Sequence, residues 1–374
     1  GNAHEVTTYR IDGDYEDGRH PKDVTFTASL DEDLKRRDFT INAMAYNDKE
    51  GLVDLYGGLL DLQRSCIRCV GDPVERFGED ALRILRALRF AAQLDFGIEQ
   101  NTYNAIRGMA HTLKKISAER IATELIKLLT SGHPEYMEHM YELEITRVIL
   151  PEFDAMMSTP QNNPHHCYHV GGHTIESLKY VPADKVLRLT MLFHDMGKPS
   201  CRVTDADGID HFKGHAQAGM EISRKVMQRL KLDNDTIYQV TSLIKWHDYR
   251  MTPTQENVRV MLNKTGPDLF EKLLDVQYAD TMAQSGYYRK EKLQRITGVR
   301  QCFAEVMKAG QCYSLKDLKL TGQDLISMGT KPGPRIGQML NTVLEQVLKY
   351  PEKNQRDYLL FYANTLVEED KSAD

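Results

Sequence analysis

The sequence predicts a mostly α-helical protein with a short α/β segment at its start. Two runs rich in β-branched residues, 6–11 and 24–30, are typical of strands, and apolar and polar residues alternate in the second run. From Asp80 onward, apolar residues recur at helical spacing almost throughout the chain. No apolar run approaches the roughly 18 residues of a membrane-spanning helix, so we expect no membrane partner.

The composition limits the classes of protein that this chain can belong to. Its 374 residues exceed what one hydrophobic core usually organises, so we expect several domains. With 41% hydrophobic and 27% charged residues the chain is typical of a globular protein and not of a disordered one. At a net charge of −6, nucleic-acid binding would need a local basic patch. The six cysteines are scattered, and Cys66 and Cys69 have no second pair, which favours the reducing cytoplasm over disulfides or a zinc site.

We expect four parts, divided where helix stops and changes of composition occur. Residues 1–63 hold both strand-like runs, and residues 64–150 hold two strong helical stripes. A stretch rich in Pro, Asn and Ser opens a second helical block at 151–300, and a smaller helical block follows at 301–374. The first stripe consists of Ala81, Leu82, Leu85, Leu88 and Ala92, and the second of Ile121, Leu125, Leu128 and Leu129.

Histidines cluster in the second helical block, where eight of the 13 lie between His165 and His247. Imidazole is the commonest protein metal ligand, so this clustering at expected helix ends indicates a metal site. His194 and Asp195 close an apolar helix that Gly197 then ends. Asp195 is able to bridge two cations, because a carboxylate has two oxygens.

The candidate ligands come from several expected helices. They are His173, His194, Asp195, His215, His247 and Asp280. This mixture of imidazole and carboxylate suits a divalent transition metal (Mn, Fe, Ni or Zn) or Mg²⁺, singly or paired, for the hydrolysis of phosphate esters. We expect the remaining histidines of the block in loops or around the site; they are His165, His166, His169 and His211.

This order of a histidine, a His-Asp pair and a distant aspartate resembles the HD phosphohydrolase superfamily. His215 and His247 match the additional ligands of its two-metal members. Lys198 matches the lysine of that family's HDxGK run, and the resemblance implies that it faces the substrate phosphate and acts in catalysis. The implied activity is metal-dependent hydrolysis of 2′,3′-cyclic phosphates, nucleotides or tRNA ends.

A second group of charged residues lies upstream of the histidines. Asp80 and Arg83 are three residues apart and are predicted to share a helix face, which Arg86 and Arg89 continue. An aspartate beside an arginine offers an acceptor next to a donor fork, which matches cytosine or adenine and rejects guanine or uracil. Arg86 and Arg89 would then hold a triphosphate or an RNA backbone. On spacing alone, the same pattern is also typical of a solvated, salt-bridged helix face.

Longer strings surround these residues: RRDFTINAMAYN, DLYGGLLDL, GEDALRILRALRFAAQLDF and SAERI, in this order. They resemble the class II tRNA nucleotidyltransferase and bacterial poly(A) polymerase family. The resemblance implies a nucleotidyltransferase head at 1–63, a nucleotide-selecting neck at 64–150, an HD domain at 151–300 and a tRNA-binding tail at 301–374. It implies these contacts: Arg36, Arg37, Asp38 and Asn42 near the sugar and phosphates, Asp80 and Arg83 on the base, and Glu119 and Arg120 in support.

The activity implied by this resemblance is addition of C and A to tRNA 3′ ends from CTP and ATP, with Mg²⁺. Poly(A) addition, and A-only or CC-only addition, remain alternatives. The segments LTGQDL and KPGPRIG near the end of the chain resemble the tail of HD-containing CCA-adding enzymes. This implies that Lys331 and Arg335 lie near the backbone phosphates of tRNA. The oligomeric state is not predicted.

One motif of that family, a glycine loop followed by an Asp-x-Asp strand, has no match in the chain. In the family this carboxylate pair holds the Mg²⁺ ions that activate the attacking hydroxyl and stabilise the leaving pyrophosphate. Asp12 with Asp14, and Asp31 with Asp33, have the spacing but follow no glycine loop. We therefore expect an N-terminally shortened member that does not carry out the transfer itself. A tRNA-binding remnant without either chemistry is the third alternative.

Overall fold

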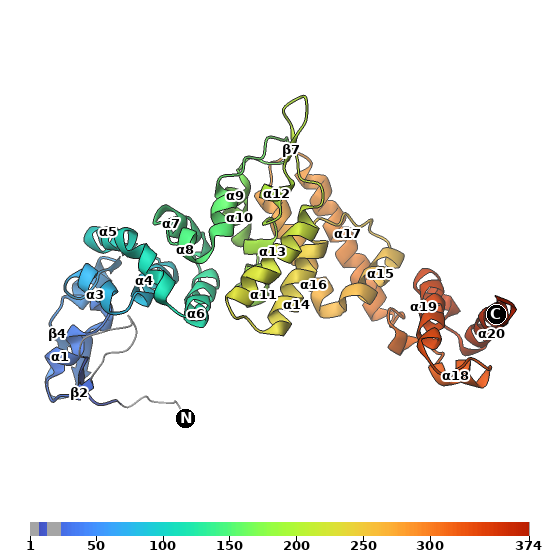
Figure 1. Cartoon of the computed structure of the whole chain (residues 1–374), viewed down its shortest axis with the longest axis horizontal. Helices are drawn as coiled ribbons and strands as arrows, with labels where there is room; N and C mark the ends of the chain where they lie inside the picture. Colours follow the sequence, from blue (N-terminus) through green and yellow to red (C-terminus); the bar gives the residue numbers. More distant parts are fainter. Residues whose placement is uncertain (1–6, 13–23, 374) are drawn as a thin grey trace. The chain divides into compact units, whose positions relative to one another are not determined.

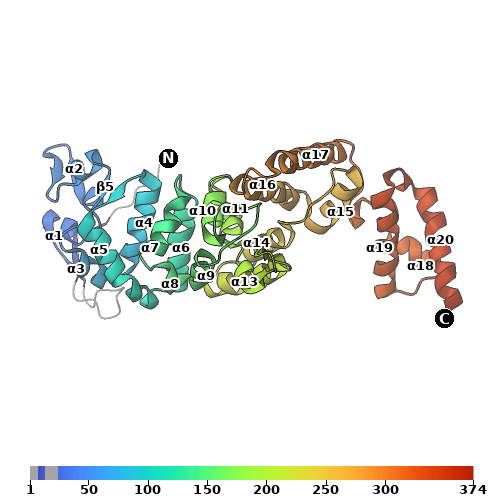
Figure 2. The same ribbon diagram turned by 90° about the horizontal axis from the view of Figure 1, so that it is seen from above.

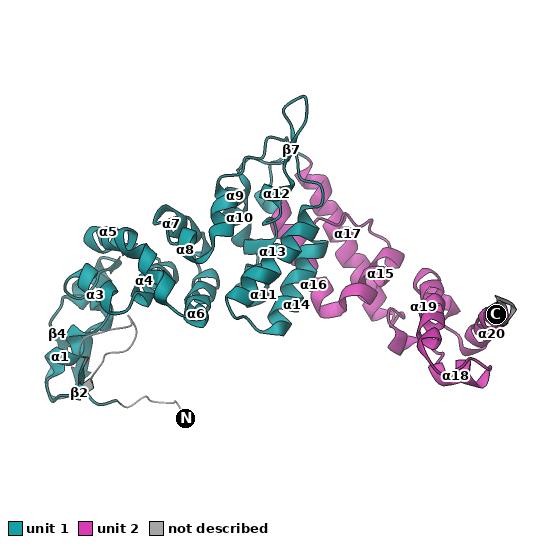
Figure 3. Ribbon diagram, in the orientation of Figure 1, with its two compact units in different colours: residues 1–247, 282–287 teal, residues 248–281, 288–374 magenta. Residues whose placement is uncertain are grey.

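The computed structural model describes residues 7–12 and 24–373 and is mostly helical, as the sequence predicts (Figure 1). The chain divides into two compact units (Figure 3): residues 1–247 with 282–287, and residues 248–281 with 288–374. Among the described residues, no helix has both the length and the hydropathy that crossing a bilayer requires.

The first unit begins with short strands and helices. They are β1 (Arg10–Asp12), β2 (Val24–Phe26), α1 (Leu30–Lys35), η1 (Thr40–Asn42), β3 (Met44–Asn47), β4 (Gly51–Asp54), α2 (Gly58–Gln63) and β5 (Cys66–Ile67). β1 pairs antiparallel with β2, and β3 with β4. The second predicted strand run ends early because the Ser29 side chain accepts a hydrogen bond from the Glu32 N–H and so starts α1. The segment between β1 and β2, residues 13–23, lies outside the described residues.

A helical segment follows within the same unit. It contains α3 (Pro73–Glu79), α4 (Leu82–Leu94), β6 (Gly97–Ile98), α5 (Gln100–Met109), η2 (Ala110–Lys115), α6 (Ala118–Leu129), η3 (Pro134–Tyr136), α7 (Met137–Glu142), α8 (Thr146–Ile149) and α9 (Pro151–Met157). Except for Ala81, which precedes α4, the residues of the two predicted apolar stripes lie on α4 and α6, which pack against each other. Leu88 and Leu125 are almost fully buried, so this packing fixes the face from which the arginines of α4 project.

The histidine-rich block completes the first unit. It contains α10 (Val170–Leu178), α11 (Lys185–Phe193), α12 (Lys198–Cys201), β7 (Val203–Thr204), β8 (Asp210–His211), α13 (His215–Arg229) and α14 (Asn234–Trp246). α13 and α14 lie side by side in both views (Figures 1 and 2), and α11 packs against α10 and α14. α11 is buried along nearly its whole length, which makes it the central helix of this block.

The second unit is helical. It contains α15 (Gln255–Thr265), most of α16 (Pro267–Ala283), α17 (Arg289–Lys308), η4 (Leu315–Asp317), α18 (Gly322–Ser327), α19 (Pro334–Lys349), η5 (Pro351–Lys353) and α20 (Arg356–Ala373). Its last helices share a core in which Leu325, Val343, Val347 and Leu359 are almost fully buried. Arg259 of α15 donates to the carbonyl oxygen of Leu348 at 2.7 Å, which ties α15 to the end of α19.

Candidate functional site

A pocket of about 480 Å³ opens where α4 meets the segment around η1. It is lined by Arg36, Arg37, Asp38, Asn42, Asp80, Leu82, Arg83, Arg86, Phe90 and Arg120. All predicted nucleotide-binding residues except Arg89 and Glu119 therefore lie together. Phe90 is a lining residue that the sequence analysis missed, although its place one turn beyond Arg86 puts it on the same helix face. Five arginines against two aspartates make the lining net positive, which suits a polyphosphate.

Asp38 organises the floor of this pocket. Its Oδ1 accepts from the Phe39 N–H at 2.9 Å and from Asn42 Nδ2 at 3.1 Å. Its Oδ2 accepts from Arg86 Nε at 2.7 Å. Asp38 is buried, whereas the Arg86 side chain is one-third exposed. Asp38 therefore holds Arg86 in place with its outer guanidinium edge toward the pocket.

Asp80 lies before α4 and not on it, so the prediction that Asp80 and Arg83 share a helix face is wrong. α3 ends at Glu79 and α4 begins at Leu82. Asp80 Oδ1 accepts from the Leu82 N–H at 3.0 Å. A short acidic side chain satisfies the first N–H groups of a helix better than it fits the helix interior, which explains the difference.

The partner of Asp80 is Arg120 of α6, in a two-point ion pair of 2.7 and 3.3 Å. Arg83 instead pairs with Glu79 and donates to the backbone oxygens of Arg76 and Arg36. Asp80 and Arg83, the two residues expected to contact the base, thus line the same pocket, although different neighbours hold their side chains. Arg120 lies 40 residues from Asp80 along the chain, so helical spacing gave no signal for this pair.

Arg89 and Glu119, which the sequence analysis predicted to bind or support the nucleotide, do not line the pocket. Arg89 is buried between α4 and α6, with Nε 2.6 Å from Glu124 Oε2 and its guanidinium 3.7 Å from the centre of the Phe90 ring. Burial lowers the pKa of Arg89, and Glu124 partly opposes this effect. Glu119 is exposed in the first turn of α6. The burial of Arg89 argues for a structural role, because a buried guanidinium needs a fixed partner.

Asp31 and Asp33, the carboxylate pair nearest to the pocket in sequence, both have side-chain partners. Asp33 is buried and pairs with Arg36 at 2.6 Å and Arg37 at 3.0 Å. Burial raises the pKa of Asp33, but its hydrogen bonds from Arg36 and Arg37 outweigh this and lower it. Asp31 accepts from the Tyr56 hydroxyl at 2.7 Å. The Asp33 contacts orient Arg36 and Arg37, which line the pocket.

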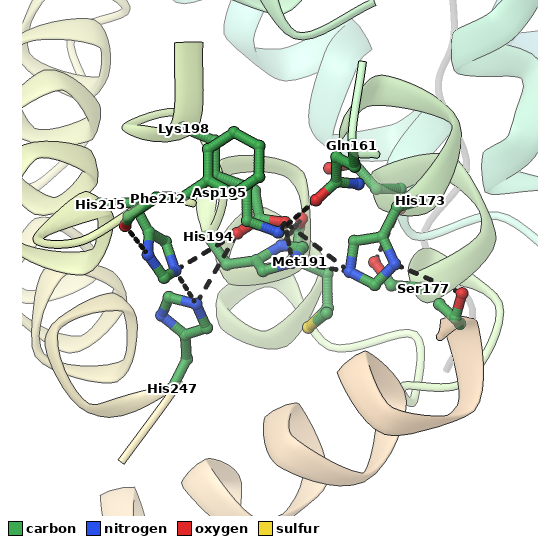
Figure 4. A network of polar contacts seen from close by, with 12 residues as sticks. Gln161, His173, Ser177, Met191, His194, Asp195, Lys198, Phe212, His215 and His247 are labelled. Carbon is green, nitrogen blue, oxygen red and sulfur yellow. Dashed lines mark hydrogen bonds and ion pairs between the residues drawn. The ribbon is translucent and has the colours of Figure 1, made fainter. Parts of the chain in front are cut away.

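The second site lies in the histidine-rich block, where four imidazoles surround Asp195 (Figure 4). His173 comes from α10, His194 and Asp195 follow α11, His215 begins α13, and His247 follows α14. His173 and His194 are fully buried and Asp195 nearly so. Five of the six predicted ligands are therefore brought together within one unit.

The imidazoles form two groups, one around each oxygen of Asp195. The Oδ2 half-site consists of His173 and His194, whose Nε2 atoms lie 3.7 and 3.2 Å from Asp195 Oδ2. The Oδ1 half-site consists of His215 and His247, whose Nε2 atoms lie 3.6 and 3.8 Å from Asp195 Oδ1. Within each half-site the potential ligand atoms all lie within 4.8 Å of one another.

Backbone contacts fix the tautomer of all four rings. Each Nδ1 atom lies 2.7–3.3 Å from a carbonyl oxygen, those of Ala283, Met191, Phe212 and Ile244. A carbonyl only accepts, so Nδ1 carries a hydrogen, and Nε2 is the ring atom that faces Asp195 and can bind a metal ion through its lone pair. The Nε2 atoms of His173 and His194 are 3.3 Å apart, and those of His215 and His247 are 3.2 Å apart. Lone pairs facing one another at this distance repel unless a cation lies between them, so the residues fit two divalent metal ions.

Lys198 lies against this cluster and is buried. Its Nζ is 2.7 Å from Asp195 Oδ2 and donates to Gln161 Oε1 at 2.7 Å. The ammonium also lies 5.4 Å from the centre of the Phe212 ring. Burial raises the pKa of Asp195, but the adjacent His194 and the Lys198 ammonium hold it well below its usual value, so the carboxylate is ionised. Gln161 belongs to a loop, and no helical spacing linked it to Lys198.

The remaining candidates are not part of the two half-site groups. Asp280 is on α16 in the second unit and belongs to neither half-site group. The ring of His166 packs edge-on against His173, and His169 caps α10. The ring of His165 packs against Tyr287, and His211 pairs with Asp205. Lys331 is exposed before α19, and Arg335 is exposed in its first turn.

Three family models match the chain. One is described as the head domain of poly A polymerase (residues 1–68), one as a probable RNA- and SrmB-binding site of polymerase A (95–157), and one as a putative second domain of tRNA nucleotidyltransferase (215–363). The fold and the arginine-lined pocket thus define a nucleotidyltransferase with helical RNA-binding parts. This confirms the resemblance of the sequence to the tRNA nucleotidyltransferase and poly(A) polymerase family.

Curated relatives narrow the class to one family. The CCA-adding enzyme of Pediococcus pentosaceus is 31% identical over 372 residues, which cover 99% of this chain and 81% of that protein. The CCA-adding enzyme of Lacticaseibacillus paracasei is 34% identical over 364 residues, covering 96% and 77%. The chain belongs to the CCA-adding enzyme family.

Solved structures have the same fold. The Bacillus stearothermophilus CCA-adding enzyme in complex with CTP is 24% identical, with a TM-score of 0.69, over 100% of this chain and 81% of that one. An apo form of a CCA-adding enzyme is 21% identical, with a TM-score of 0.56, over 95% and 75%.

Proposed function

We propose that this chain selects and binds the nucleotide in CCA addition, taking CTP and ATP for transfer to the 3′ end of tRNA. The observation that carries this proposal is the pocket in which Asp80 and Arg83 lie beside Arg86, Arg37 and Phe90. Five arginines suit a triphosphate, and one carboxylate beside a guanidinium suits the edges of cytosine and adenine. The curated relatives named above are CCA-adding enzymes, which favours CCA addition over poly(A) addition.

The chain's own residues bind and orient the nucleotide in this proposal. Arg120 immobilises Asp80 as an acceptor, and a carboxylate oxygen held by one guanidinium keeps a further lone pair for a base amino group. Glu79 and two backbone oxygens immobilise Arg83, whose five donors exceed these three contacts. Mg²⁺ neutralises the phosphates and activates the attacking hydroxyl in nucleotidyl transfer. We assign no Mg²⁺ ligand for that step to the described residues.

Binding measurements with the four nucleoside triphosphates test this proposal. We expect CTP and ATP to bind at least about tenfold more tightly than GTP and UTP, because the wrong edges leave buried donors and acceptors unpaired. Asp80→Asn should remove this preference, and Arg83→Ala should weaken CTP and ATP binding. Glu119→Ala is the control, since Glu119 is exposed outside the pocket. Equal affinity for all four nucleotides would exclude base selection here.

We further propose that the four segments expected from the sequence have separate roles. Residues 1–63 form the head segment, 64–150 the nucleotide-selecting neck, 151–300 the HD domain and 301–374 the tail. Lys331 and Arg335 bind backbone phosphates of tRNA at the start of α19, where a helix N-terminus adds a partial positive charge. A double substitution Lys331→Gln and Arg335→Gln should weaken tRNA binding and lower its salt dependence, while CTP binding stays unchanged.

A second candidate function rests on the four Nε2 lone pairs aimed at Asp195. We propose that the HD domain binds two divalent ions and hydrolyses phosphate esters such as 2′,3′-cyclic phosphates. Metal ions at such a site polarise the phosphoryl group and supply a nucleophilic water. Lys198 contributes a buried positive charge beside them.

Metal content and phosphoesterase activity test this second function together. Asp195→Asn should abolish both, because it removes the shared carboxylate. Asp235→Asn is the matched control, since Asp235 is exposed in the first turn of α14. Protein that contains no metal after purification with added Mn²⁺ or Ni²⁺ would count against the function.

A further inference from the structure

Phe90 contacts two arginines at the edge of the nucleotide pocket. Among the described residues that line this pocket it is the one aromatic side chain, and it is half-buried in α4. The guanidinium carbon of Arg86 lies 5.3 Å from the centre of the Phe90 ring, and that of Arg89 lies 3.7 Å from it. The face of an aromatic ring carries partial negative charge and attracts such cations. Phe90 therefore interacts with both the arginine of the pocket and the arginine of the core.

Two neighbours fix the orientation of the Phe90 ring. The ring of Phe39 is fully buried and packs against it at nearly a right angle, with the ring centres 5.9 Å apart. Arg89 is itself fixed, because its Nε lies 2.6 Å from Glu124 Oε2 of α6. A ring held by a buried neighbour and a fixed cation has little freedom to turn.

Arg86 needs the ring because its ion pair alone leaves the guanidinium free to turn. Asp38 Oδ2 accepts from Arg86 Nε at 2.7 Å and lies 2.6 Å from Nη2, so both contacts end on the same oxygen. A guanidinium paired with both oxygens of a carboxylate has a fixed direction, whereas one paired with a single oxygen is able to pivot about it. The Phe90 ring limits this rotation.

One nitrogen of Arg86 remains for a ligand. In the described part of the chain, Arg86 Nη1 has no hydrogen-bond acceptor, although it carries two donor hydrogens. The phosphate oxygens of a nucleotide are suitable acceptors for a guanidinium in this net-positive pocket.

We propose that Phe90 is a positioning residue for the nucleotide phosphates: its ring keeps Arg86 from pivoting on Asp38 and so presents Nη1 to the phosphates. This inference rests on the proposed nucleotide-binding function. It also divides recognition into two parts, since phosphate binding depends on the ring and base selection does not.

Base selection is independent of Phe90 because other neighbours hold the residues expected to contact the base. Asp80 pairs with Arg120 at 2.7 Å, and Arg83 pairs with Glu79. A substitution at Phe90 therefore leaves both of these pairs in place.

Competition binding of CTP, UTP and cytidine to the full chain, at one fixed Mg²⁺ concentration, tests this proposal. Phe90→Leu keeps an apolar side chain but removes the ring. We expect its CTP affinity to fall about three- to tenfold, which corresponds to the loss of one partly desolvated cation–π contact. Cytidine affinity should change less than about twofold, and the preference for CTP over UTP should remain. Phe90→Tyr keeps the ring and should restore CTP affinity to within about twofold of the unsubstituted chain.

Double variants show whether Phe90 acts through Arg86. In an Arg86→Gln background, Phe90→Leu should change CTP affinity less than about twofold, because the guanidinium that the ring holds is gone. In an Arg37→Gln background it should cause its full loss, since Arg37 lines the pocket and pairs with Asp33. Phe153→Leu is the control for removal of a ring from the core: Phe153 is fully buried in α9, and its loss should lower stability without changing CTP affinity.

The outcomes separate this inference from the function on which it rests. Equal losses of CTP and cytidine affinity in Phe90→Leu, or the same loss of CTP affinity with and without Arg86, would overturn the inference and leave the nucleotide pocket standing. No binding of any nucleoside triphosphate to the unsubstituted chain would overturn both. If Phe90→Leu does not fold, Phe90→Met, which also lacks the ring, gives the same comparison.

Discussion

Arginines that are alike in sequence have different roles in the nucleotide pocket. Arg86 and Arg89 are three residues apart on α4, yet Arg86 lines the pocket and is held by Asp38, whereas Arg89 is buried against Glu124. The difference comes from what faces each residue across the helix interface. Arg89 points toward α6, whose apolar stripe carries the single buried carboxylate Glu124.

Glu124→Gln tests the structural role of Arg89. It leaves a buried guanidinium without its counter-charge, so we expect the free energy of unfolding to fall by about 3 kcal/mol. Urea denaturation followed by circular dichroism measures this change. CTP affinity of the folded variant should stay within about twofold, since neither residue lines the pocket.

Lys127→Gln provides the comparison for that experiment. Lys127 is half-exposed, and its Nζ lies 3.6 Å from the same Glu124. A surface ion pair of this kind contributes less than about 1 kcal/mol. An equal loss of stability in Lys127→Gln and Glu124→Gln would contradict the assignment of Arg89 to the core.

At the scale of elements, most residues of the candidate metal site lie at the ends of helices. His194 and His247 follow the last turns of their helices, and each Nδ1 lies 2.7 Å from the carbonyl oxygen three residues earlier. Helix C-termini leave such carbonyls without partners, so an imidazole placed there is oriented by the helix itself. The same end geometry brings histidines from separate helices to one carboxylate.

Close packing of two helix ends is needed to complete the Oδ1 half-site. A Cβ at Gly197 would lie 2.1 Å from the carbonyl oxygen of His215 and 2.5 Å from the Gly219 nitrogen. Gly197→Ala should therefore push the start of α13 away from Asp195. We expect at least about tenfold weaker metal binding and a loss of about 1–3 kcal/mol in stability.

Gly108→Ala is the control for Gly197→Ala. Gly108 is exposed in α5, and a Cβ there would meet nothing within 4 Å. Alanine favours the helix over glycine, so this substitution should leave stability unchanged or raise it by up to about 1 kcal/mol. Metal binding that is unaffected by Gly197→Ala would show that the close approach is not required.

The stability of the start of α18 is expected to depend on pH, because an aspartate takes part in its capping box. Asp324 accepts from the Thr321 N–H in a capping box and pairs with Arg356 of α20 at 2.7 Å. The Arg356 and Thr321 hydrogen bonds lower the pKa of Asp324 from 3.8 to about 2. Because the folded value is depressed, this stabilisation is complete above pH 3.8 and is lost as the pH falls through about 2.

Asp324→Asn should therefore lower the stability of the second unit by up to about 1 kcal/mol at pH 7. The difference between the variant and the unsubstituted chain should shrink between pH 4 and pH 2. Denaturation curves at several pH values measure it. A difference that is constant down to pH 2 would rule out the ion pair as its source.

The sequence predicts those parts of the site that helical order alone places. The stripes of α4 and α6 and five clustered metal ligands are readable from spacing and residue type. The β-like runs 6–11 and 24–30 are only partly strands in the described residues, at Arg10–Ile11 and Val24–Phe26. Two contacts cannot be predicted from spacing: the ion pair of Asp80 with Arg120 and the hydrogen bond of Lys198 with Gln161. Each joins segments about 40 residues apart, because one partner lies in a loop or on a separate helix. Asp80 also illustrates a local limit, since i+3 spacing does not tell a helix interior from a helix start.

At the scale of the whole molecule, the metal site and the last helices lie in different compact units. The two half-sites belong to the first unit, and the core of α18, α19 and α20 belongs to the second. A ligand stabilises what it binds by an amount that depends on its concentration relative to its dissociation constant, about 2.7 kcal/mol at a hundredfold excess. If the units unfold separately, metal stabilises only the first.

Removing the metal should therefore act on one unit. In hydrogen exchange of the full chain, a chelator should raise the exchange of amides in α10, α11, α13 and α14, which carry the ligands, and leave α18, α19 and α20 unchanged. The expected loss in the first set is about 2–4 kcal/mol of opening free energy. Asp195→Asn should exchange like the chelated protein with or without metal. Equal loss of protection in both sets would mean that the two units unfold as one, and no loss in either set would mean that metal does not stabilise the fold.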